Sequence, residues 1–374
     1  MGDRVLITGG AGFIGSHLAD ALLQEGYEVR VYDSLVPQVH GEGRAAPSYL
    51  SDEVEFVAGD VRDREGLERA LREVRIVFHL AAAVGVAQSM YEIQRYTEVN
   101  VLGTAVLLDI LAEGKHQVEK LIVASSMSIY GEGKYECPQC GVVYPRMRSL
   151  EKLRSRVWEM ECPHCGRTLR PLPTDEDKPL HPASVYAISK RDQEEMCLCV
   201  GRAYGIPTVA LRYFNVYGPR QALSNPYTGV AAIFSARLLN GNPPLIFEDG
   251  LQSRDFVHVS DVVRASLLAM KSEEANYEAF NVGTGRPLRV IDMAHALCQK
   301  LRPDIEPVIV NRFREGDIRH CYADISKIRA RLGFEPRVRF EEGIEDLIGW
   351  IEEQTAADRV EWAKEELVRR GLLL

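Results

Sequence analysis

The glycine-rich segment GGAGFIG constrains the fold of this 374-residue chain more than any other feature. It follows a strand-like run from Arg4 to Thr8 and precedes SHLADALLQEG, whose apolar residues recur at helical spacing. Gly9 permits a tight turn, Gly12 lets the backbone approach a pyrophosphate at the helix N-terminus, and Gly15 allows close packing of the helix. The segment therefore predicts a strand, a turn and a helix that bind a dinucleotide.

Strand-like runs alternate with helical patterns along much of the chain. The runs VEFVAGD, RIVFHLAA, KLIVASS and PTVALRYFN are separated by helical patterns such as REGLERALREV and NVLGTAVLLDILAEG. This alternation is typical of a parallel sheet covered by helices on both faces, so we expect a doubly wound α/β fold. Ligands of such folds bind beyond the carboxyl ends of the strands, where the sequence places Asp60, Ala81 to Ala83, Ser125, Ser126 and Asn215.

The same patterns suggest how the chain divides. We expect a dinucleotide-binding domain over residues 1–215, continued by 255–285, and a smaller substrate-binding lobe over 216–254 and 286–350. Residues 132–172 interrupt the strand and helix rhythm and are interpreted as an insertion. Residues 351–374 are predicted to form a helical tail.

The second predicted strand, YEVRVYD, indicates which dinucleotide is bound. It ends at Asp33, where an acidic side chain can accept hydrogen bonds from the adenosine ribose hydroxyls. The same charge repels a phosphate on that ribose, by about 1 kcal/mol in water and about 4 kcal/mol at intermediate dielectric. We therefore expect NAD to be favoured over NADP. A solvated aspartate after a generic glycine turn is the alternative.

Tyr186 and Lys190 lie four residues apart in SVYAISKRDQ, so both side chains project from one helix face. A free tyrosine has a pKa of about 10, and a nearby ammonium can lower it enough for the phenol to act as a base near neutrality. Taken alone, the short pattern also fits a buried tyrosine packed beside a lysine. Together with Ser126 and the glycine turn, it indicates an enzyme that transfers hydride.

Composition and charge restrict the compartment and the partners. With 46% hydrophobic and 26% charged residues, the sequence is typical of a soluble globular protein. A net charge of -9 argues against nucleic acid as the main partner. No apolar run is long enough to cross a bilayer and no signal segment precedes the first strand, so we expect no membrane partner and a cytoplasmic location.

Four of the eight cysteines have the spacing of a metal site. Cys137 and Cys140 form one CPxC knuckle and Cys162 and Cys165 form a second, each followed by glycine. We interpret them as the ligands of a structural zinc ribbon, with a redox dithiol pair or an iron site as alternatives. His164 is expected on the surface. Cys197, Cys199 and Cys298 are expected in the core.

The motifs together resemble the extended short-chain dehydrogenase/reductase family, in particular its NAD-dependent nucleotide-sugar epimerases and dehydratases. The resemblance covers about residues 1–350 and rests on TGGAGFIGSHL, HLAA, NVLGT, SSMSIYG, YAISK, RYFNVYGPRQ, SRDFVHVSDVV, FNVGTG and REGDIRHCYADISK. It implies that Tyr186 is the catalytic base, that Lys190 holds the nicotinamide ribose and lowers the pKa of the phenol, and that Ser126 hydrogen-bonds the reacting sugar oxygen. The coenzyme contacts it implies are Gly9, Gly12, Phe13, Ile14, Gly15, Asp33, Asp60, Val61, Ala81, Ala82, Ala83, Asn100, Ser125, Tyr186, Lys190 and Tyr213.

The resemblance also implies a site for a nucleoside-diphosphate sugar. Arg254 and Arg314 correspond to diphosphate-binding arginines, a role that suits guanidinium, and Asn215 would approach the same diphosphate. Asp317 would bind the nucleoside ribose, Leu245 and Phe247 would form the base pocket, and Cys321 occupies a position that gates the sugar pocket. By analogy with the family, we also expect a homodimer built from helices around residues 97–112 and 186–203.

The expected reaction depends on two positions after Ser126. Dehydratases of this family carry an acid pair there, because elimination needs its own proton donor and base, whereas this chain has Met127 and Ser128. A 4-epimerase needs neither acid. Residues 220–262 resemble enzymes acting on dTDP-6-deoxyhexoses such as dTDP-L-rhamnose. A UDP-glucose, UDP-hexosamine or UDP-uronate epimerase, a dehydratase or 4-keto reductase, and an NAD-sensing regulator remain as alternatives.

Overall fold

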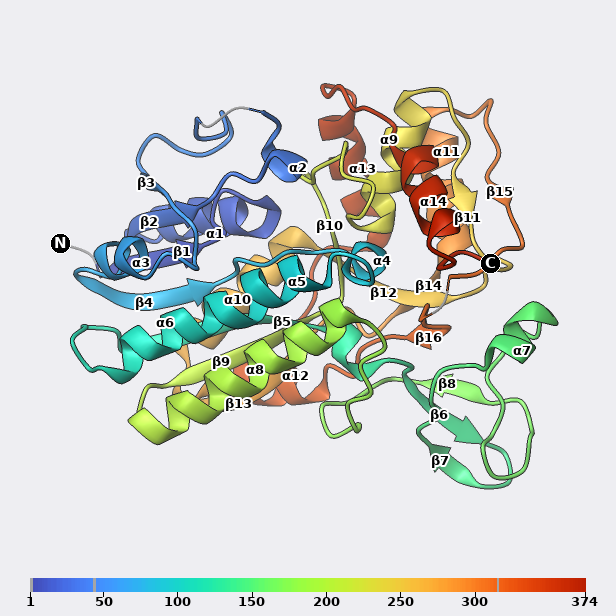
Figure 1. Cartoon of the computed structure of the whole chain (residues 1–374), viewed down its shortest axis with the longest axis horizontal. Coiled ribbons are helices and arrows are strands. Elements are labelled where there is room, and N and C mark those ends of the chain that lie inside the picture. Colours follow the sequence, from blue (N-terminus) through green and yellow to red (C-terminus); the bar gives the residue numbers. More distant parts are fainter. Residues whose placement is uncertain (1–2, 43–44, 315) are drawn as a thin grey trace.

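The computed structural model describes residues 3–42, 45–314 and 316–374. It contains a large parallel sheet, a smaller lobe and an antiparallel insertion that extends from the side of the molecule (Figure 1). Within the described ranges, no helix combines the length and the apolar character that a bilayer crossing requires.

Seven parallel strands form the large sheet, in the order β13-β9-β5-β4-β1-β2-β3. Every neighbouring pair is parallel, and the order reverses on either side of β1, as in a doubly wound sheet. The fold class predicted from the sequence is thus confirmed. The strands are β1 (Arg4–Thr8), β2 (Glu28–Asp33), β3 (Glu55–Ala58), β4 (Val74–His79), β5 (Lys120–Ser126), β9 (Thr208–Tyr213) and β13 (Glu278–Val282).

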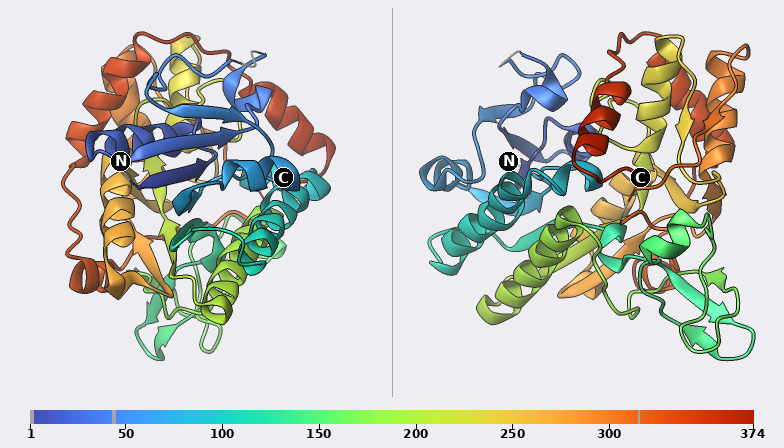
Figure 2. Two further views of the ribbon diagram at one scale, coloured as in Figure 1. Left: turned by 90° about the vertical axis from the view of Figure 1, so that its left-hand side faces the viewer. Right: turned by 45° about the vertical axis from the view of Figure 1, so that its right-hand side comes forward.

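Helices cover both faces of this sheet (Figure 2). One apolar core includes residues of α1 (Phe13–Gln24), α10 (Val259–Lys271) and α12 (Ser326–Leu332). The core on the other face includes residues of α3 (Arg64–Ala70), α6 (Gly103–Ala112) and α8 (Val185–Tyr204). The sheet is therefore buried on both faces, which explains the nearly continuous apolar sequence of its central strands.

The smaller lobe combines short strands with three helices around a third apolar core. Strands β10 (Asn215–Tyr217), β12 (Ser253–His258), β14 (Pro287–Arg289) and β16 (His320–Cys321) form one sheet, and β11 (Leu245–Ile246) pairs with β15 (Val308–Ile309). The helices are α9 (Val230–Leu239), α11 (Val290–Leu301) and α13 (Phe340–Ile351), followed by α14 (Val360–Arg369). Ile328 and Phe334, within the range predicted for this lobe, pack instead in a core of the large sheet.

The insertion is a three-stranded antiparallel sheet with a small core of its own. Its order is β7 (Gly141–Val143), β6 (Lys134–Cys137) and β8 (Arg170–Leu172), and α7 (Leu150–Arg154) lies between β7 and β8 in the chain. In Figure 1 it lies next to β16 of the smaller lobe, away from β1 to β3. The remaining short helical segments are α2 (Pro37–His40), α4 (Val86–Ser89), α5 (Ile93–Tyr96), η1 (Thr97–Leu102), η2 (Met127–Tyr130) and η3 (Glu273–Ala275).

The start of α8 places Tyr186 in the first helical turn. The Ser184 hydroxyl accepts a hydrogen bond from the backbone amide of Ala187 at 3.1 Å, which satisfies one of the free amides of that turn. The Tyr186 amide donates to the Ser89 hydroxyl at 3.0 Å. At the other end, Gly205 closes the helix with a φ of 70°, which glycine adopts without strain. The catalytic pair predicted from the sequence therefore lies on a helix that is fixed at both ends.

Candidate active site

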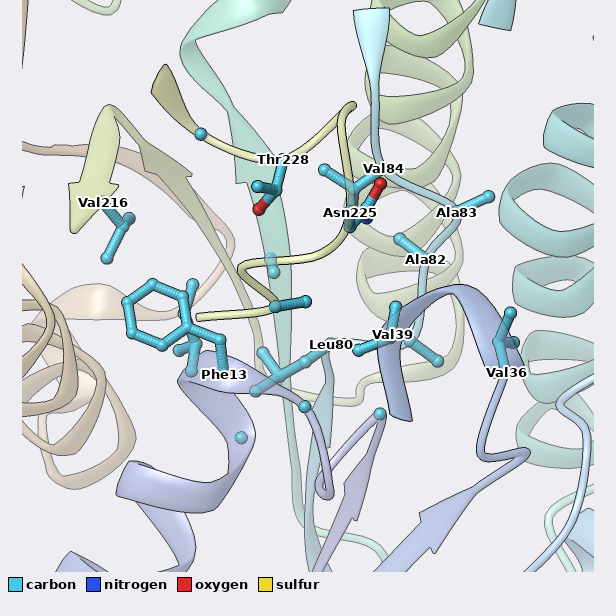
Figure 3. Close-up of a pocket in the computed structure, with 18 of the residues that line it drawn as sticks. Phe13, Val36, Val39, Leu80, Ala82, Ala83, Val84, Val216, Asn225 and Thr228 are labelled. Atoms are coloured by element: carbon cyan, nitrogen blue, oxygen red, sulfur yellow. The ribbon is translucent and has the colours of Figure 1, made fainter. Parts of the chain in front are cut away.

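A cavity of about 690 Å³ runs along the carboxyl ends of the sheet strands towards the smaller lobe. Figure 3 shows apolar side chains on its wall, among them Phe13, Leu80, Val84 and Val216, with Asn225 as a polar contribution. Of the residues predicted to contact the coenzyme, all except Asn100 line this cavity: Gly9, Gly12, Phe13, Ile14, Gly15, Asp33, Asp60, Val61, Ala81, Ala82, Ala83, Ser125, Tyr186, Lys190 and Tyr213.

The glycine turn forms a cradle with space for a ligand at one position. Gly9 has a φ of 70°, and a Cβ there would lie 2.8 Å from the backbone nitrogen of Ala81. A Cβ on Gly15 would lie 2.6 Å from the Cα of Gly10. A Cβ on Gly12 would lie 3.3 Å from the carbonyl oxygen of Gly9 and more than 4 Å from every other atom of the described residues outside its chain neighbours and its own helix. The turn thus needs glycine at positions 9 and 15 for its own packing, and at Gly12 it leaves room that suits an approaching diphosphate.

Asp33 and Asp60 lie at the ends of neighbouring strands and are held in place by local hydrogen bonds. The Asp33 carboxylate accepts from the amides of Ala11 at 3.1 Å and Leu35 at 2.9 Å. The Asp60 carboxylate pairs with Arg62, whose hydrogen bond holds the pKa of that carboxyl below its usual range. The Asp60 carboxylate therefore stays ionised at neutral pH, and each of the two carboxylates has further acceptor positions for a ligand in the cavity.

Ser126, Tyr186 and Lys190 meet at the end of β5. The phenol of Tyr186 hydrogen-bonds with the Ser126 side chain. Burial raises the pKa of this phenol above its ordinary value, and the hydrogen bond with Ser126 only partly opposes the rise. The expected lowering of the pKa by Lys190 is not found in this arrangement, because Lys190 is directed to a different partner.

That partner is Gln193, which sequence reasoning missed. The Lys190 ammonium donates to the Gln193 side-chain oxygen at 2.6 Å, and burial lowers the pKa of the ammonium to about 8. The Gln193 amide nitrogen in turn donates to the Thr104 hydroxyl at 2.8 Å. Gln193 follows Lys190 by three residues on the same helix, and this spacing is the signal that could have revealed it.

Asn100 acts one layer behind the cavity. It lies in the π-helical segment η1, whose wider turns directly precede the regular α-helix α6. Its side chain accepts from the Ala83 amide at 2.7 Å, and it donates to the Ala83 carbonyl at 3.0 Å and to the Ser189 hydroxyl at 2.9 Å. Asn100 therefore fixes the cavity wall at Ala83 and ties it to α8, whereas the family resemblance implied a contact with the coenzyme.

Two buried amide oxygens in the cavity have no hydrogen-bond partner. They belong to Asn215, which was predicted to face the diphosphate, and to Gln221, which was not predicted. A buried acceptor without a partner is costly, so such groups commonly mark the place where a ligand binds. Asn215 begins β10, a strand of the smaller lobe, and Gln221 follows the same strand.

The other predicted substrate residues do not line this cavity. They gather in the smaller lobe: the Arg314 guanidinium lies 4.8 Å from the centre of the Phe247 ring, and its Nε donates to the Asp317 carboxylate at 2.9 Å. Arg254 donates to the carbonyl oxygens of Ile318 and Arg319. Leu245 begins β11, two residues before Phe247, and Cys321 is buried with its sulfur 3.8 Å from the Thr174 hydroxyl.

The two CPxC knuckles come together as their spacing predicts. The sulfur atoms of Cys137, Cys140, Cys162 and Cys165 all lie within 4.8 Å of one another, which suits four thiolates around one tetrahedral metal ion. His164 is exposed and outside the cluster, as expected. Cys197 and Cys298 are buried as expected, but the prediction for Cys199 is wrong, because it lies on the exposed side of α8.

Comparison with known proteins adds the family. The model of the NAD dependent epimerase/dehydratase family matches residues 5–146 and 164–283 of the chain. The chain belongs to this family. The unmatched residues 147–163 lie inside the insertion, between its strands β7 and β8. Between residues 5 and 283, only this central part of the insertion lies outside the ranges that the family model matches.

Several relatives match nearly the whole chain. A dTDP-L-rhamnose 4-epimerase of Burkholderia thailandensis is 35% identical, with 94% of this chain and 96% of the relative covered. The crystal structure of a UDP-glucose 4-epimerase of Thermotoga maritima with UDP-glucose has a TM-score of 0.75 at 35% identity, covering 94% of this chain and 99% of the other. The Thermus thermophilus UDP-glucose 4-epimerase complex with NAD has a TM-score of 0.74 at 33% identity, covering 94% and 100%.

Proposed function

We propose that this protein is an NAD-dependent nucleotide-sugar 4-epimerase, an isomerase. One observation carries the proposal: Ser126, Tyr186 and Lys190 line the same cavity as the glycine cradle and Asp33. A hydroxyl, a phenol and an amine beside a dinucleotide site are the groups that a reversible oxidation of a secondary alcohol requires. The full-length similarity to 4-epimerases supports the same reaction.

Each group has a distinct part in the reaction. When bound, oxidised NAD supplies the hydride acceptor for C4 of the sugar and a positive ring charge. Tyr186 takes the proton of the 4-hydroxyl group and later returns it, while Ser126 hydrogen-bonds the same sugar oxygen. Lys190, held by Gln193, is proposed to orient the nicotinamide ribose. The resulting 4-keto sugar turns over and receives the hydride on its other face.

The substrate we favour is a dTDP-6-deoxyhexose such as dTDP-L-rhamnose, the sugar nucleotide named for the relative from Burkholderia thailandensis. Arg254, Arg314 and Asn215 are proposed to bind the diphosphate, and Asp317 the nucleoside ribose. Leu245 and Phe247 are proposed for the base, and the small Cys321 for the edge of the sugar pocket. UDP-glucose, UDP-hexosamine and UDP-uronate are the alternative substrates.

The surroundings of Ser126 favour epimerisation over dehydration. Met127 and Ser128 are both buried, and the Ser128 hydroxyl donates to the Ser126 hydroxyl at 2.9 Å. A dehydratase needs a proton donor and a base at these positions, and neither side chain supplies a carboxyl group. A 4-keto reductase and an NAD-sensing regulator are the further alternatives. Asp33 argues against the NADPH that a reductase would release at every turnover.

We further propose structural zinc at the four cysteines and a cytoplasmic homodimer. Four thiolates within bonding reach of one ion suit Zn²⁺, and free thiols fit a reducing compartment. Ile93, Leu102 and Ile188 are exposed apolar residues on the helices that the family analogy assigns to the dimer interface. The measurements are metal content after purification and molar mass in solution.

The function is tested with a panel of UDP-, dTDP- and GDP-sugars read by proton NMR for inversion at C4. Tyr186→Phe should lower turnover at least about a thousandfold, because the phenylalanine side chain has no hydroxyl group that can take and return the proton. NAD binding should persist. Tyr204→Phe is the matched control, since Tyr204 lies on the same helix and is 58% exposed. A regulator would keep its function in both variants, and equal turnover of Tyr186→Phe and the wild type would overturn the proposal.

A further inference from the structure

An ionic cluster with a buried centre and a partly exposed rim joins the cysteine-rich insertion to the smaller lobe. We call it the junction cluster; its members are Arg148, Glu159, Glu248, Asp249 and Arg319. Arg148 and Glu159 come from the insertion, and the other three from the smaller lobe. Since isolated charges are rarely buried, such a cluster persists only where its members satisfy one another.

Arg148 makes the direct connection between the two parts. Its side chain is 2% exposed, and its guanidinium donates two parallel hydrogen bonds to the Glu248 carboxylate, at 2.9 and 2.7 Å. Its remaining contacts are with carbonyl oxygens, of Trp158 in the insertion and of Asp317 in the smaller lobe, both at 3.0 Å. The paired bonds need a planar fork, which arginine has and lysine lacks.

Arg319 gathers the remaining carboxylates. Its side chain is completely buried and donates to Glu248 at 3.1 Å and to Asp249 at 2.6 Å, and it also pairs with Glu159 of the insertion. Glu248 has a φ of 54°, in the left-handed region that residues other than glycine rarely adopt. Hydrogen bonds to Arg148 and Arg319 oppose the cost of this conformation, which indicates that the cluster fixes the backbone there.

The cluster holds the segment that carries the predicted nucleotide-binding residues. Arg148 binds the carbonyl of Asp317, whose carboxylate accepts from Arg314. Arg254 binds the carbonyls of Ile318 and Arg319. Both predicted diphosphate arginines are thus attached to residues 317–319, and Glu248 directly follows Phe247, which lies against Arg314.

Apolar contacts support the same connection. The ring of Trp158, in the insertion, meets the ring of Phe313 edge to face at 6.3 Å, and both are buried together with Leu153. Phe313 also exchanges two backbone hydrogen bonds with Leu374, each 3.0 Å long. Phe313, the residue before Arg314, is therefore held between the insertion and the C-terminal residues.

We propose that Arg148 is a positioning residue for the nucleotide half of the substrate, so that the insertion sets the affinity for the sugar nucleotide. This inference deepens the proposed function and depends on it. The cavity that holds the glycine cradle and Tyr186 has no lining residue from the insertion among the described residues. Coenzyme binding and the chemical step should therefore be independent of Arg148.

The test compares Arg148→Met and Arg148→Lys with the wild type. Arg148→Met should raise KM for the sugar nucleotide at least tenfold, with kcat changed less than threefold and NAD affinity unchanged. Arg148→Lys keeps the charge without the fork and should lie between the two, and it serves as the second variant if Arg148→Met does not fold. Arg170→Gln is the matched control in the same insertion, because the Arg170 side chain is 71% exposed.

Hydrogen exchange supplies a readout that does not depend on turnover. Amides of residues 245–249 and 316–321 should exchange at least tenfold faster in both Arg148 variants, and at the wild-type rate in Arg170→Gln. Unchanged KM and unchanged exchange would overturn the inference, as would an equal loss of NAD affinity. If the wild-type protein turns over no sugar nucleotide and binds neither UDP nor dTDP, the proposed function fails. The exchange rates then still decide whether Arg148 holds this segment.

Discussion

The cavity predicted to hold the coenzyme (the coenzyme side) and the region of the smaller lobe proposed to bind the nucleotide (the nucleotide side) are built in different ways. The coenzyme side consists of strand ends, backbone amides and a glycine cradle, so its shape comes mainly from the main chain. The nucleotide side depends on side-chain charges from positions far apart in sequence, with Arg148, Glu248 and Arg319 at its centre. The coenzyme side is therefore specified by a short local motif. The nucleotide side is specified by contacts between residues that only the complete fold brings together.

Because the two sides are built differently, substitutions on each side should impair the protein in different ways. A substitution on the coenzyme side should act on coenzyme affinity or on the chemical step, because the parallel sheet tolerates a change at its edge. A substitution in the junction cluster should act on stability and on sugar-nucleotide affinity, because it leaves a charge buried without its partner.

The largest expected effect is at Lys190. Lys190→Met should lower kcat about a thousandfold, because the nicotinamide ribose loses the ammonium group proposed to orient it beside Tyr186. Burial lowers the pKa of Lys190 to about 8, so the folded protein bears the cost of a charged lysine in full below pH 8. After allowance for the lost bond to Gln193, the variant should be about 2 kcal/mol more stable at pH 7.

The sign of this effect can be checked by the pH dependence of unfolding. Between pH 8 and 10.5 the unfolded chain holds a proton on Lys190 that the folded protein does not, so the stability of the wild type should rise with pH. The difference between the wild type and Lys190→Met should shrink across that range in urea titrations without coenzyme. A variant that is less stable than the wild type at pH 7 would contradict the assignment.

The second effect tests the nucleotide side. Glu248→Gln should lower the free energy of unfolding by about 3 kcal/mol, because Arg148 and Arg319 would share a buried neutral amide in place of a carboxylate. Denaturant titration measures the change. Glu136→Gln is the control, because Glu136 pairs with Arg170 at the surface, and its loss should cost less than about 1 kcal/mol. Equal losses of stability in Glu248→Gln and Glu136→Gln would contradict the buried charge cluster as the basis of the nucleotide side.

The third effect tests the cradle. Gly12 has a φ of -75°, which alanine adopts freely, and a Cβ there would make a tight contact of 3.3 Å with the Gly9 carbonyl oxygen, which a small shift relieves. Gly12→Ala should therefore lower the free energy of unfolding by about 1 kcal/mol or less. It should weaken NAD binding at least about tenfold, or 1.4 kcal/mol, because the methyl group occupies the place of the diphosphate. Gly349→Ala, on the solvent side of α13 with no atom within 4 Å, is the control. Calorimetric titration with NAD distinguishes them.

The smallest effect is at Glu159. Its hydrogen bond with His320 lowers the pKa of the carboxyl to about 2, so its contribution to stability is complete above pH 4.5 and is lost as the pH falls towards 2. Because the side chain is 43% exposed, solvent screening limits this contribution to about 1 kcal/mol. Glu159→Gln should reduce the loss of unfolding free energy between pH 4.5 and pH 2. An unchanged loss in that range would show that the pairing of Glu159 with His320 contributes nothing to stability.

Most of the residues that the sequence predicts for the coenzyme line one cavity of the structure. Gly9, Gly12, Gly15 and Asp33 act through local strand and turn geometry, which periodicity and spacing reveal. The parallel sheet with helices on both faces followed from the alternation of strands and helices, whereas the order of the strands was not predicted. The cysteine cluster followed from its spacing in the same way.

Other features could not be predicted because they depend on tertiary contacts. Arg148 and Glu248 are 100 positions apart, and nothing in either local sequence marks them as partners. The raised pKa of Tyr186 arises from burial, which a four-residue spacing does not report. Cys199 was misplaced because residues two positions apart point to nearly opposite sides of a helix, so Cys199 cannot share the buried face of Cys197.

The most direct test of the account is the fate of a deuterium label at C4 of the sugar. Wild-type protein is incubated with dTDP-L-rhamnose or UDP-glucose deuterated at C4, and the products are read by proton NMR and mass spectrometry. The account predicts inversion at C4 with the deuterium retained, because the hydride taken from C4 returns to it within the same turnover. Inversion with loss of the label to solvent, or a 4-keto product accumulating with free NADH, would contradict it.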